Sequence, residues 1–284
     1  MRIICAAAIV LALPLVANAL AKDDPSGLYN PSQGDTSYPI LGANIQRSGS
    51  SPNYSYSVAA DWANRPVNFV SFWDAARFAN WLHNDQPTGP QGPGTTEDGA
   101  YHNVGNQALF GRNAGAKFFI PTQDEWYKAA YHDKTAGLAA SYFDYPTGTN
   151  AVPGNDLTET TNPGNNGNYS ISGLAIGHPY YRTSVGEFEL SDSPYGTFDQ
   201  GGNVYEWNET KVNVSSRGMP GGAFSSGPSA SLVHHHGPGD DFNDAGFRVA
   251  SISPVPEPSS VILLACLWGS FVHTRYFFRR PLTA

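Results

Sequence analysis

The sequence predicts an irregular domain in which two helices and a few short strands are joined by long loops. Three observations support this fold. The 284-residue chain contains 30 glycines and 22 prolines, only two segments show helical spacing, and the strand-like runs are short. Because glycine and proline interrupt regular structure, we expect loops over most of the chain outside the two helices.

The two helices are predicted from capping boxes followed by apolar residues at helical spacing. In SFWDAARFANWLHN, Ser71 precedes Asp74 by three residues, and the apolar residues that follow share one face. In PTQDEWYKAAYHD, Thr122 and Glu125 form a second capping box. We therefore expect helices within residues 71–84 and 121–133.

Four short runs predict strands. Residues 66–70 and 117–120 are apolar and lead into the two helices, and residues 217–224 (RGMPGGAF) and 245–250 (AGFRVA) each contain glycine. We expect short strands in all four runs.

Two long segments, residues 83–113 and 145–168, are rich in Gly, Pro, Asn and Thr. We expect ordered loops here, with disorder as the alternative. Ordered loops of this length are uncommon unless something holds them, and a bound cation is one candidate.

Residues 1–21 are predicted to be a secretory signal peptide. Arg2 precedes an apolar run over residues 3–16, and the small-residue pattern ANALA predicts cleavage after Ala19 or Ala21. A buried N-terminal helix is the alternative. The signal peptide predicts an exported protein.

The C-terminal segment, residues 254–284, resembles the PEP-CTERM sorting signal of Gram-negative bacteria. It carries Pro256-Glu257-Pro258, an apolar segment over residues 261–272, and three arginines at 275, 279 and 280. The apolar segment is short for a transmembrane helix, and the basic cluster behind it is expected to stay on the cytoplasmic side. The resemblance implies sorting by an exosortase to the cell surface or extracellular matrix, with the inner membrane as an intermediate. A simple membrane anchor is the alternative.

The remaining residues, 22–253, have the length of one large domain, and we expect a single domain. The net charge is −8 and the only obvious basic cluster lies in the C-terminal tail, which argues against nucleic acid as a partner. Both cysteines, Cys5 and Cys266, lie in the two tails. The domain between them has no thiol, so any metal it binds must use oxygen or imidazole ligands.

Five motifs occur in the order found in one known family: PVNFVSFWDAARFANWL, FIPTQDEWYKAAY, YGTFDQGGNVYEW, RGMPGGAF and NDAGFRVA. Over residues 66–250 the chain resembles the formylglycine-generating enzyme (sulfatase-modifying factor) family, whose relatives include iron-dependent ergothioneine-pathway enzymes. The resemblance implies an α+β fold that is irregular, related to C-type lectins and low in regular secondary structure. It also implies bound structural calcium.

The resemblance places a calcium loop in DQGGNVYE. Asp199 and Glu206 correspond to the carboxylate ligands, and Gly202 and Val204 to the backbone carbonyl ligands, a donor set that suits calcium. Trp207 is expected to pack in the core. The alternative is a tight turn with a capping Asp199 and a solvated Glu206.

A second calcium site is predicted by the same resemblance at Asn168 and Tyr169. The acidic ligand that should follow is not evident in the sequence. Asn168 is equally well explained as an ordinary turn residue.

Serines occupy the positions of the family's catalytic cysteine pair. Alignment on Gly221-Gly222 places those positions at Ser226 and Ser231. Serine cannot serve as a copper(I) thiolate ligand or exchange disulfides with a substrate, so copper and formylglycine generation are not expected. No nucleophile-elbow pattern surrounds Ser226, so a serine hydrolase is not expected either.

Three consecutive histidines, His234, His235 and His236, form the one histidine cluster, and aspartates at 240, 241 and 244 follow. Successive side chains of an extended segment point apart, so at most His234 and His236 can converge on one ion. A polar ligand-contacting loop is the alternative to a metal site.

We expect a calcium-stabilised module that binds a glycan or a surface protein, or else a structural matrix component. The alternative from a different class is a metal-dependent oxidase. The candidate ligand contacts are loop residues near the family's groove: Tyr180, Tyr181, Arg182, His234, His235, His236 and Asp241.

Overall fold

The computed structural model describes residues 2–4, 22–137, 141–229 and 233–252. All of these described residues belong to one compact unit. The predicted sorting tail and residues 5–21 of the predicted signal peptide lie outside the described residues. None of the helices in the described part of the chain has the length and apolar character needed to span a membrane.

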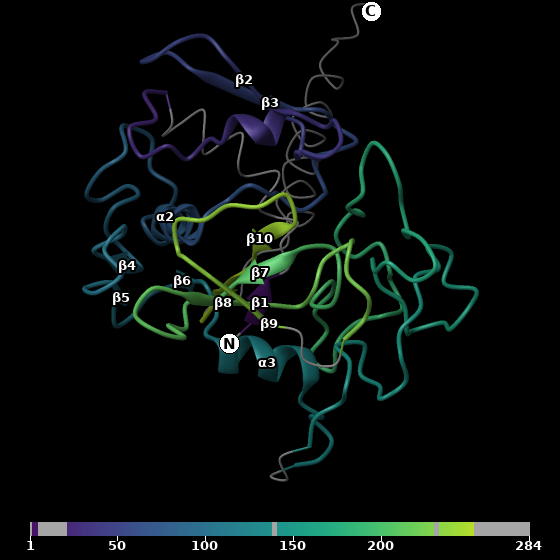
Figure 1. Cartoon of the computed structure of the whole chain (residues 1–284). Helices are drawn as coiled ribbons and strands as arrows, with labels where there is room; N and C mark the ends of the chain where they lie inside the picture. The colour runs from purple at the N-terminus through teal and green to yellow at the C-terminus, as the bar shows by residue number, and fades with distance from the viewer. Residues whose placement is uncertain (1, 5–21, 138–140, 230–232, 253–284) are drawn as a thin grey trace, which may run out of the picture. The chain divides into compact units, whose positions relative to one another are not determined.

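Figure 1 shows a strand-containing fold with few and short regular elements. In chain order the elements are β1 Arg2–Ile4, the 3-10 helix η1 Pro31–Gly34, β2 Ile45–Ser48, β3 Ser55–Val58, α2 Phe72–His83, β4 Tyr101–His102, β5 Gly111–Arg112, β6 Phe118–Phe119, α3 Gln123–Tyr131, β7 Tyr205–Trp207, β8 Arg217–Pro220, β9 Val233–His236, β10 Ala245–Phe247 and β11 Val249–Ser251. The irregular mixture of helix and strand is confirmed.

Both predicted helices form, and both begin at the predicted capping boxes. At the start of α2, the Asp74 amide donates to the Ser71 hydroxyl, and the Asp74 carboxylate accepts from the Ser71 amide. Thr122 and Glu125 make the same reciprocal pair at the start of α3. These bonds satisfy amides that would otherwise be unpaired at each helix start.

The strands pair in small sheets. β7 runs parallel to β10, β8 pairs antiparallel with β9, and β11 lies between β1 and β6. The predicted strands at residues 117–120, 217–224 and 245–250 are confirmed in shorter form. β7 also packs beside β8, so residues 205–207 lie between the last part of the chain and the β8–β9 hairpin.

The predicted strand at residues 66–70 is wrong. Phe69 has φ of 52°, a left-handed conformation that breaks an extended backbone. The segment is held by single bonds instead, since the Phe69 amide donates to the Phe242 carbonyl at 2.9 Å. The Val70 carbonyl accepts from Trp207 Nε1 at 2.9 Å.

The core is unusually rich in aromatic side chains. Trp207 is fully buried, as predicted, and lies edge-on to Phe72 of α2. Arg217 of β8 is also fully buried, with its guanidinium over the rings of Phe72 and Phe110. Cation–π contacts of this kind stabilise a charge that has little access to water.

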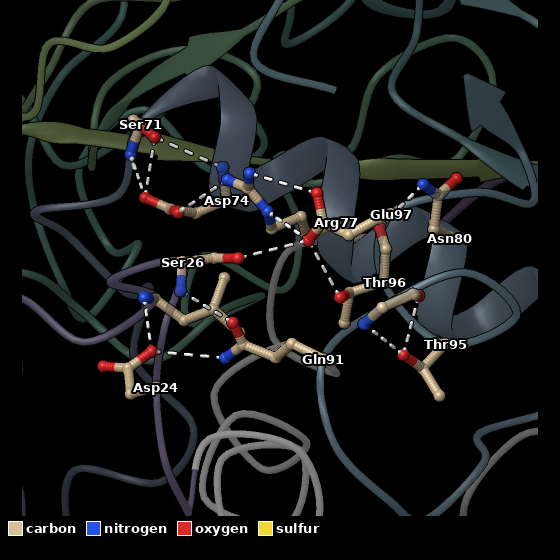
Figure 2. Close-up of polar contacts among 12 residues, drawn as sticks. Asp24, Ser26, Ser71, Asp74, Arg77, Asn80, Gln91, Thr95, Thr96 and Glu97 are labelled. Carbon is tan, nitrogen blue, oxygen red and sulfur yellow. Dashed lines mark hydrogen bonds and ion pairs between the residues drawn. The ribbon is translucent and has the colours of Figure 1, made fainter. Parts of the chain in front are cut away.

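Protein side chains hold the first long loop, residues 83–113, in place. Arg77 of α2 donates to Glu97 at 2.7 Å, and Asn80 donates to the Thr96 carbonyl at 2.8 Å. Figure 2 shows Glu97 also bonded to Ser26, so the N-terminal segment is fastened to the same point. The prediction of an ordered loop is confirmed here, and hydrogen bonds hold the loop in place.

The second long loop, residues 145–168, is organised by its own side chains. The Asp156 carboxylate accepts from the Thr161 amide at 2.8 Å. The Asn166 amide donates to the carbonyls of Thr161 and Asn162. Asp and Asn side chains commonly stabilise turns in this way.

Asp74 is a carboxylate in an apolar setting. Its side chain is 16% exposed and lines a cavity of about 20 Å³ with Val70, Phe78 and Phe247. Burial raises the pKa of the Asp74 carboxyl to about 6, although the Ser71 hydrogen bonds and Arg77 lower it. The folded protein therefore favours the protonated form.

We predict that Asp74 makes the domain less stable as the pH rises from 4 to 7. Because the folded-state pKa lies above the unfolded value, the stabilising contribution is complete below about pH 4 and is lost as the pH passes through 6. Relative to Asp74→Asn, the wild-type chain should lose up to about 3 kcal/mol of unfolding free energy over this range. Urea unfolding at several pH values measures it.

Ser71→Ala is the matched control for Asp74→Asn. It removes the hydroxyl of the same capping box but keeps the carboxyl group, so it should lower stability while leaving the pH dependence in place. A difference between wild type and Asp74→Asn that stays constant from pH 4 to 7 contradicts the prediction.

Candidate functional site

The predicted calcium loop is held by a buried ion pair. Glu206 of β7 is 2% exposed and both of its carboxylate oxygens accept from the Arg248 guanidinium, which is itself fully buried. Trp126 Nε1 of α3 donates to the same carboxylate at 2.7 Å. The alternative of a solvated Glu206 is therefore excluded by the structure.

Asp199 lies at the other end of the loop, where fewer partners offset the cost of burying its carboxylate. Its carboxylate accepts from the Gly186 amide at 2.7 Å. Burial raises the pKa of the Asp199 carboxyl to about 6, while that hydrogen bond and the charge of Arg248 lower it. Asp199 also lines a cavity of about 10 Å³, room for one water-sized species, together with Thr147, Asn166 and other residues.

The possible oxygen ligands of the loop suit a calcium ion only at the Asp199 end. Asp199 is a buried carboxylate beside a cavity of mixed polar and apolar lining, and its oxygens suit a hard cation. Glu206 already neutralises Arg248, so an ion there would have to share its carboxylate. Gly202 needs to be glycine, since its φ is 80° and a Cβ would lie 2.5 Å from the Asn168 carbonyl oxygen, whereas Val204 is buried.

Asn168 and Tyr169 pack against this loop. The Asn168 side chain donates to the Tyr181 carbonyl and to Asn203, and its Oδ1 has no hydrogen-bond partner among the described residues. The Tyr169 carbonyl accepts from Asn155 at 3.0 Å. Asn168 thus joins two loops in the interior. Its unpaired Oδ1 is the one atom of this side chain available as a ligand for a second ion.

Ser226, which the family resemblance predicts to stand at the first cysteine position, belongs to a chain of polar side chains. Its Oγ lies 2.8 Å from Tyr205 Oη, which lies 3.4 Å from His234 Nε2. The Ala223 amide also donates to Ser226 Oγ at 3.3 Å. Ser231, the second cysteine position, lies outside the described residues.

Tyr205 and His234 also belong to a row of four neighbouring rings. The His234 ring centre lies 4.5 Å from Tyr205 and 6.0 Å from His236, and His236 lies 4.5 Å from Phe242. We call Tyr205, His234, His236 and Phe242 the ring row. His234 is exposed, His236 and Phe242 are half-buried, and Tyr205 is buried at 6% exposure, so only the β9 part of the row is open to solvent.

The other predicted ligand contacts are distributed differently. His235 is exposed on the opposite face of β9, and Asp241 accepts from Asn30 at 2.9 Å. Tyr181 packs beside Phe224, whereas Tyr180 donates to Asp61 and lies under the Arg65 guanidinium. The structure brings His234 and His236 together, whereas Tyr180, Tyr181 and Asp241 have separate partners.

Arg182 does not reach a surface. It is fully buried, and its guanidinium donates to the backbone carbonyls of Leu41 and Gly42 at 2.8 and 3.0 Å. Burial lowers the pKa of Arg182 to about 9. Its contacts are structural, since a ligand outside the domain has no access to this side chain.

Two residues of the site were not predicted as site residues: Tyr205 and Arg248. Tyr205 sits within the predicted loop but reaches Ser226 and the ring row. Arg248 is a charged residue in the apolar run AGFRVA, a signal that a buried partner exists somewhere. The described residues hold no group of three or more His, Cys, Asp or Glu side chains that could bind a metal.

Comparison with known proteins decides the family. The sulfatase-modifying factor enzyme 1-like domain matches residues 31–252. The chain belongs to the sulfatase-modifying factor family. No match is found among curated proteins.

Solved structures resemble this sulfatase-modifying factor domain in fold. The crystal structure of CarF is 20% identical, with 89% of this chain and 86% of that chain covered and a TM-score of 0.54. Treponema denticola variable protein 1 is 19% identical over 69% of this chain and 74% of that chain, with a TM-score of 0.45. PvdO from Pseudomonas aeruginosa is 17% identical over 72% and 67%, with a TM-score of 0.39.

We predict that Tyr205→Phe weakens the polar chain at Ser226 without disturbing the ring row. The variant loses only the hydroxyl between Ser226 and His234. Its free energy of unfolding in urea should therefore be about 0.5–1.5 kcal/mol lower than that of wild type. Tyr38→Phe, at a tyrosine that is 79% exposed, is the control and should change nothing. Equal stability of Tyr205→Phe and wild type would show that the hydroxyl contacts are unimportant.

Proposed function

We propose that this protein is an exported, surface-sorted recognition domain of the sulfatase-modifying factor family that does not generate formylglycine. The family match and the CarF-like fold support the scaffold. The finer proposal, recognition in place of oxidation, rests on the residues around Ser226.

The chemistry of serine argues against the family's thiolate route. By the family resemblance, Ser226 and Ser231 correspond to the two cysteine positions. The Ser226 hydroxyl is hard and weakly acidic, and in the structure it is engaged with Tyr205. It lacks the soft thiolate needed to hold copper(I) and the ability to exchange disulfides with a substrate cysteine.

The ring row is the observation that carries the recognition proposal. The rings of His234 and His236 on β9 are accessible to a ligand, and polar groups lie beside them: Ser226 Oγ, the hydroxyl of the buried Tyr205 and the histidine nitrogens. A sugar ring presents apolar C–H faces edged by hydroxyl groups, so it matches such a surface in both respects. We infer an extracellular polysaccharide as the ligand, with a surface protein as the other candidate.

A second candidate function, metal-dependent oxidation, rests on one feature, the two imidazoles of His234 and His236 on one face of β9. Imidazoles are common metal ligands.

Export and sorting are part of the proposal. The predicted signal peptide, residues 1–21, supports secretion, and the PEP-CTERM resemblance of residues 254–284 supports exosortase-dependent delivery to the surface of a Gram-negative cell. A recognition domain at the cell surface or in the matrix would meet polysaccharide there.

Structural calcium is also proposed, with Asp199 as the main ligand. The supporting observation is a buried carboxylate beside a water-sized cavity, with the carbonyls of Gly202 and Val204 and the carboxylate of Glu206 further along the loop. A bound cation would relieve the desolvation of Asp199.

The first prediction of this proposal concerns polysaccharide binding. The full chain should co-sediment with extracellular polysaccharide from the producing cells, and His234→Ala/His236→Ala should weaken that binding about tenfold or more by removing ring faces. His234→Phe/His236→Phe keeps the rings and should retain most binding, as should the control His235→Ala. Equal binding by wild type and the Ala variant, or aldehyde formation on a cysteine peptide, contradicts the proposal.

The second prediction concerns calcium. Chelation should lower the melting temperature of the wild-type chain, and calcium should restore it more effectively than magnesium, because irregular loop carbonyls suit the larger ion. In Asp199→Asn the response should disappear. A wild-type melting temperature that is indifferent to chelator and to calcium would exclude a structural calcium ion.

A further inference from the structure

The β9 strand presents two imidazoles on one face. In an extended strand, residues i and i+2 share a face and residue i+1 points the other way. His234 and His236 follow this pattern: their ring centres are 6.0 Å apart and their planes differ by 31°. His235, between them, pairs with Gly218 in the hairpin register.

The separation of the two rings suits a shared metal ion. At a metal–nitrogen bond of about 2.0–2.1 Å, the ion lies about 3.2 Å from each ring centre. The two centres are then about 4.5 Å apart for a nitrogen–metal–nitrogen angle of 90° and about 6.4 Å apart for 180°. The observed 6.0 Å between the ring centres falls within this range.

The surroundings supply further donors of the right kind. Tyr205 Oη lies 3.4 Å from His234 Nε2, with Ser226 Oγ another 2.8 Å beyond it. No third His, Cys, Asp or Glu in the described residues completes a closed cage, so such a site keeps positions open for water.

Arg217 carries the positive charge opposite His236 in the β8–β9 hairpin, but its guanidinium contacts core residues. Arg217 pairs with His236 across the strands. Its guanidinium lies over the rings of Phe72 and Phe110, and it donates to Gln107 and to the Glu209 carbonyl. Its charge is therefore already accommodated inside the core.

We propose that His234 and His236 form an open binding site for a borderline divalent metal ion, Cu²⁺, Ni²⁺ or Zn²⁺. Two imidazoles with oxygen donors and no thiolate suit these ions better than copper(I) or calcium. Among them Cu²⁺ binds most tightly, following the general order of affinity for such ligands. The site is separate from the proposed calcium loop, because neither histidine contributes to that loop.

The test uses the untagged full chain in detergent, titrated with CuCl₂ and then ZnCl₂ by calorimetry. Wild type should bind Cu²⁺ more tightly than Zn²⁺. Either His234→Phe or His236→Phe should weaken binding by at least the roughly 10- to 100-fold that loss of a hydrogen-bonding partner of a metal ligand costs. His235→Ala is the matched control on the same strand and should bind as wild type does.

Pulsed EPR of the Cu²⁺-loaded chain gives a second readout, which should show two coordinated imidazoles in wild type and one in each Phe variant. Equal affinity in wild type and both Phe variants, or equal loss in His235→Ala, overturns the proposal. So does wild-type binding with no imidazole signal. Because the Phe variants keep the ring row, loss of metal with retained polysaccharide binding separates this site from the proposed function.

Discussion

The ion pair between Glu206 and Arg248 is the contact on which the rest of the site depends. Both side chains are buried, and Trp126 of α3 donates to the same carboxylate. The pair therefore joins three parts of the chain that lie far apart in sequence. An unpaired charge in this position would be very costly, so each residue requires the other, and the pair anchors the Glu206 end of the loop from Asp199 to Trp207.

The local features of the fold could be predicted, because short-range chemistry determines them. Ser71 with Asp74 and Thr122 with Glu125 mark the helix starts directly in the sequence, and the structure has both boxes. The strand expected at residues 66–70 failed because the left-handed backbone of Phe69 has no sequence signal. Arg182 could not be recognised as buried, since its partners are carbonyls of residues 41 and 42.

The site itself was predictable only in pieces. The motif order marks Ser226 as a cysteine position, and strand periodicity predicts that His234 and His236 share a face, which the structure confirms. Neither signal reveals that Tyr205 connects them, because that contact arises from β7 packing beside β8. The same scaffold that fixes Glu206 thus also places Tyr205 beside Ser226 and His234.

The central claim is that the Glu206–Arg248 pair, rather than either residue alone, holds this scaffold. A double-mutant cycle with Glu206→Gln and Arg248→Met, measured by urea unfolding of the full chain, tests it most directly. The account predicts that each single change costs about 3–5 kcal/mol and that the double change costs far less than their sum. Additive losses, or a coupling below about 1 kcal/mol as for an exposed pair, would contradict it.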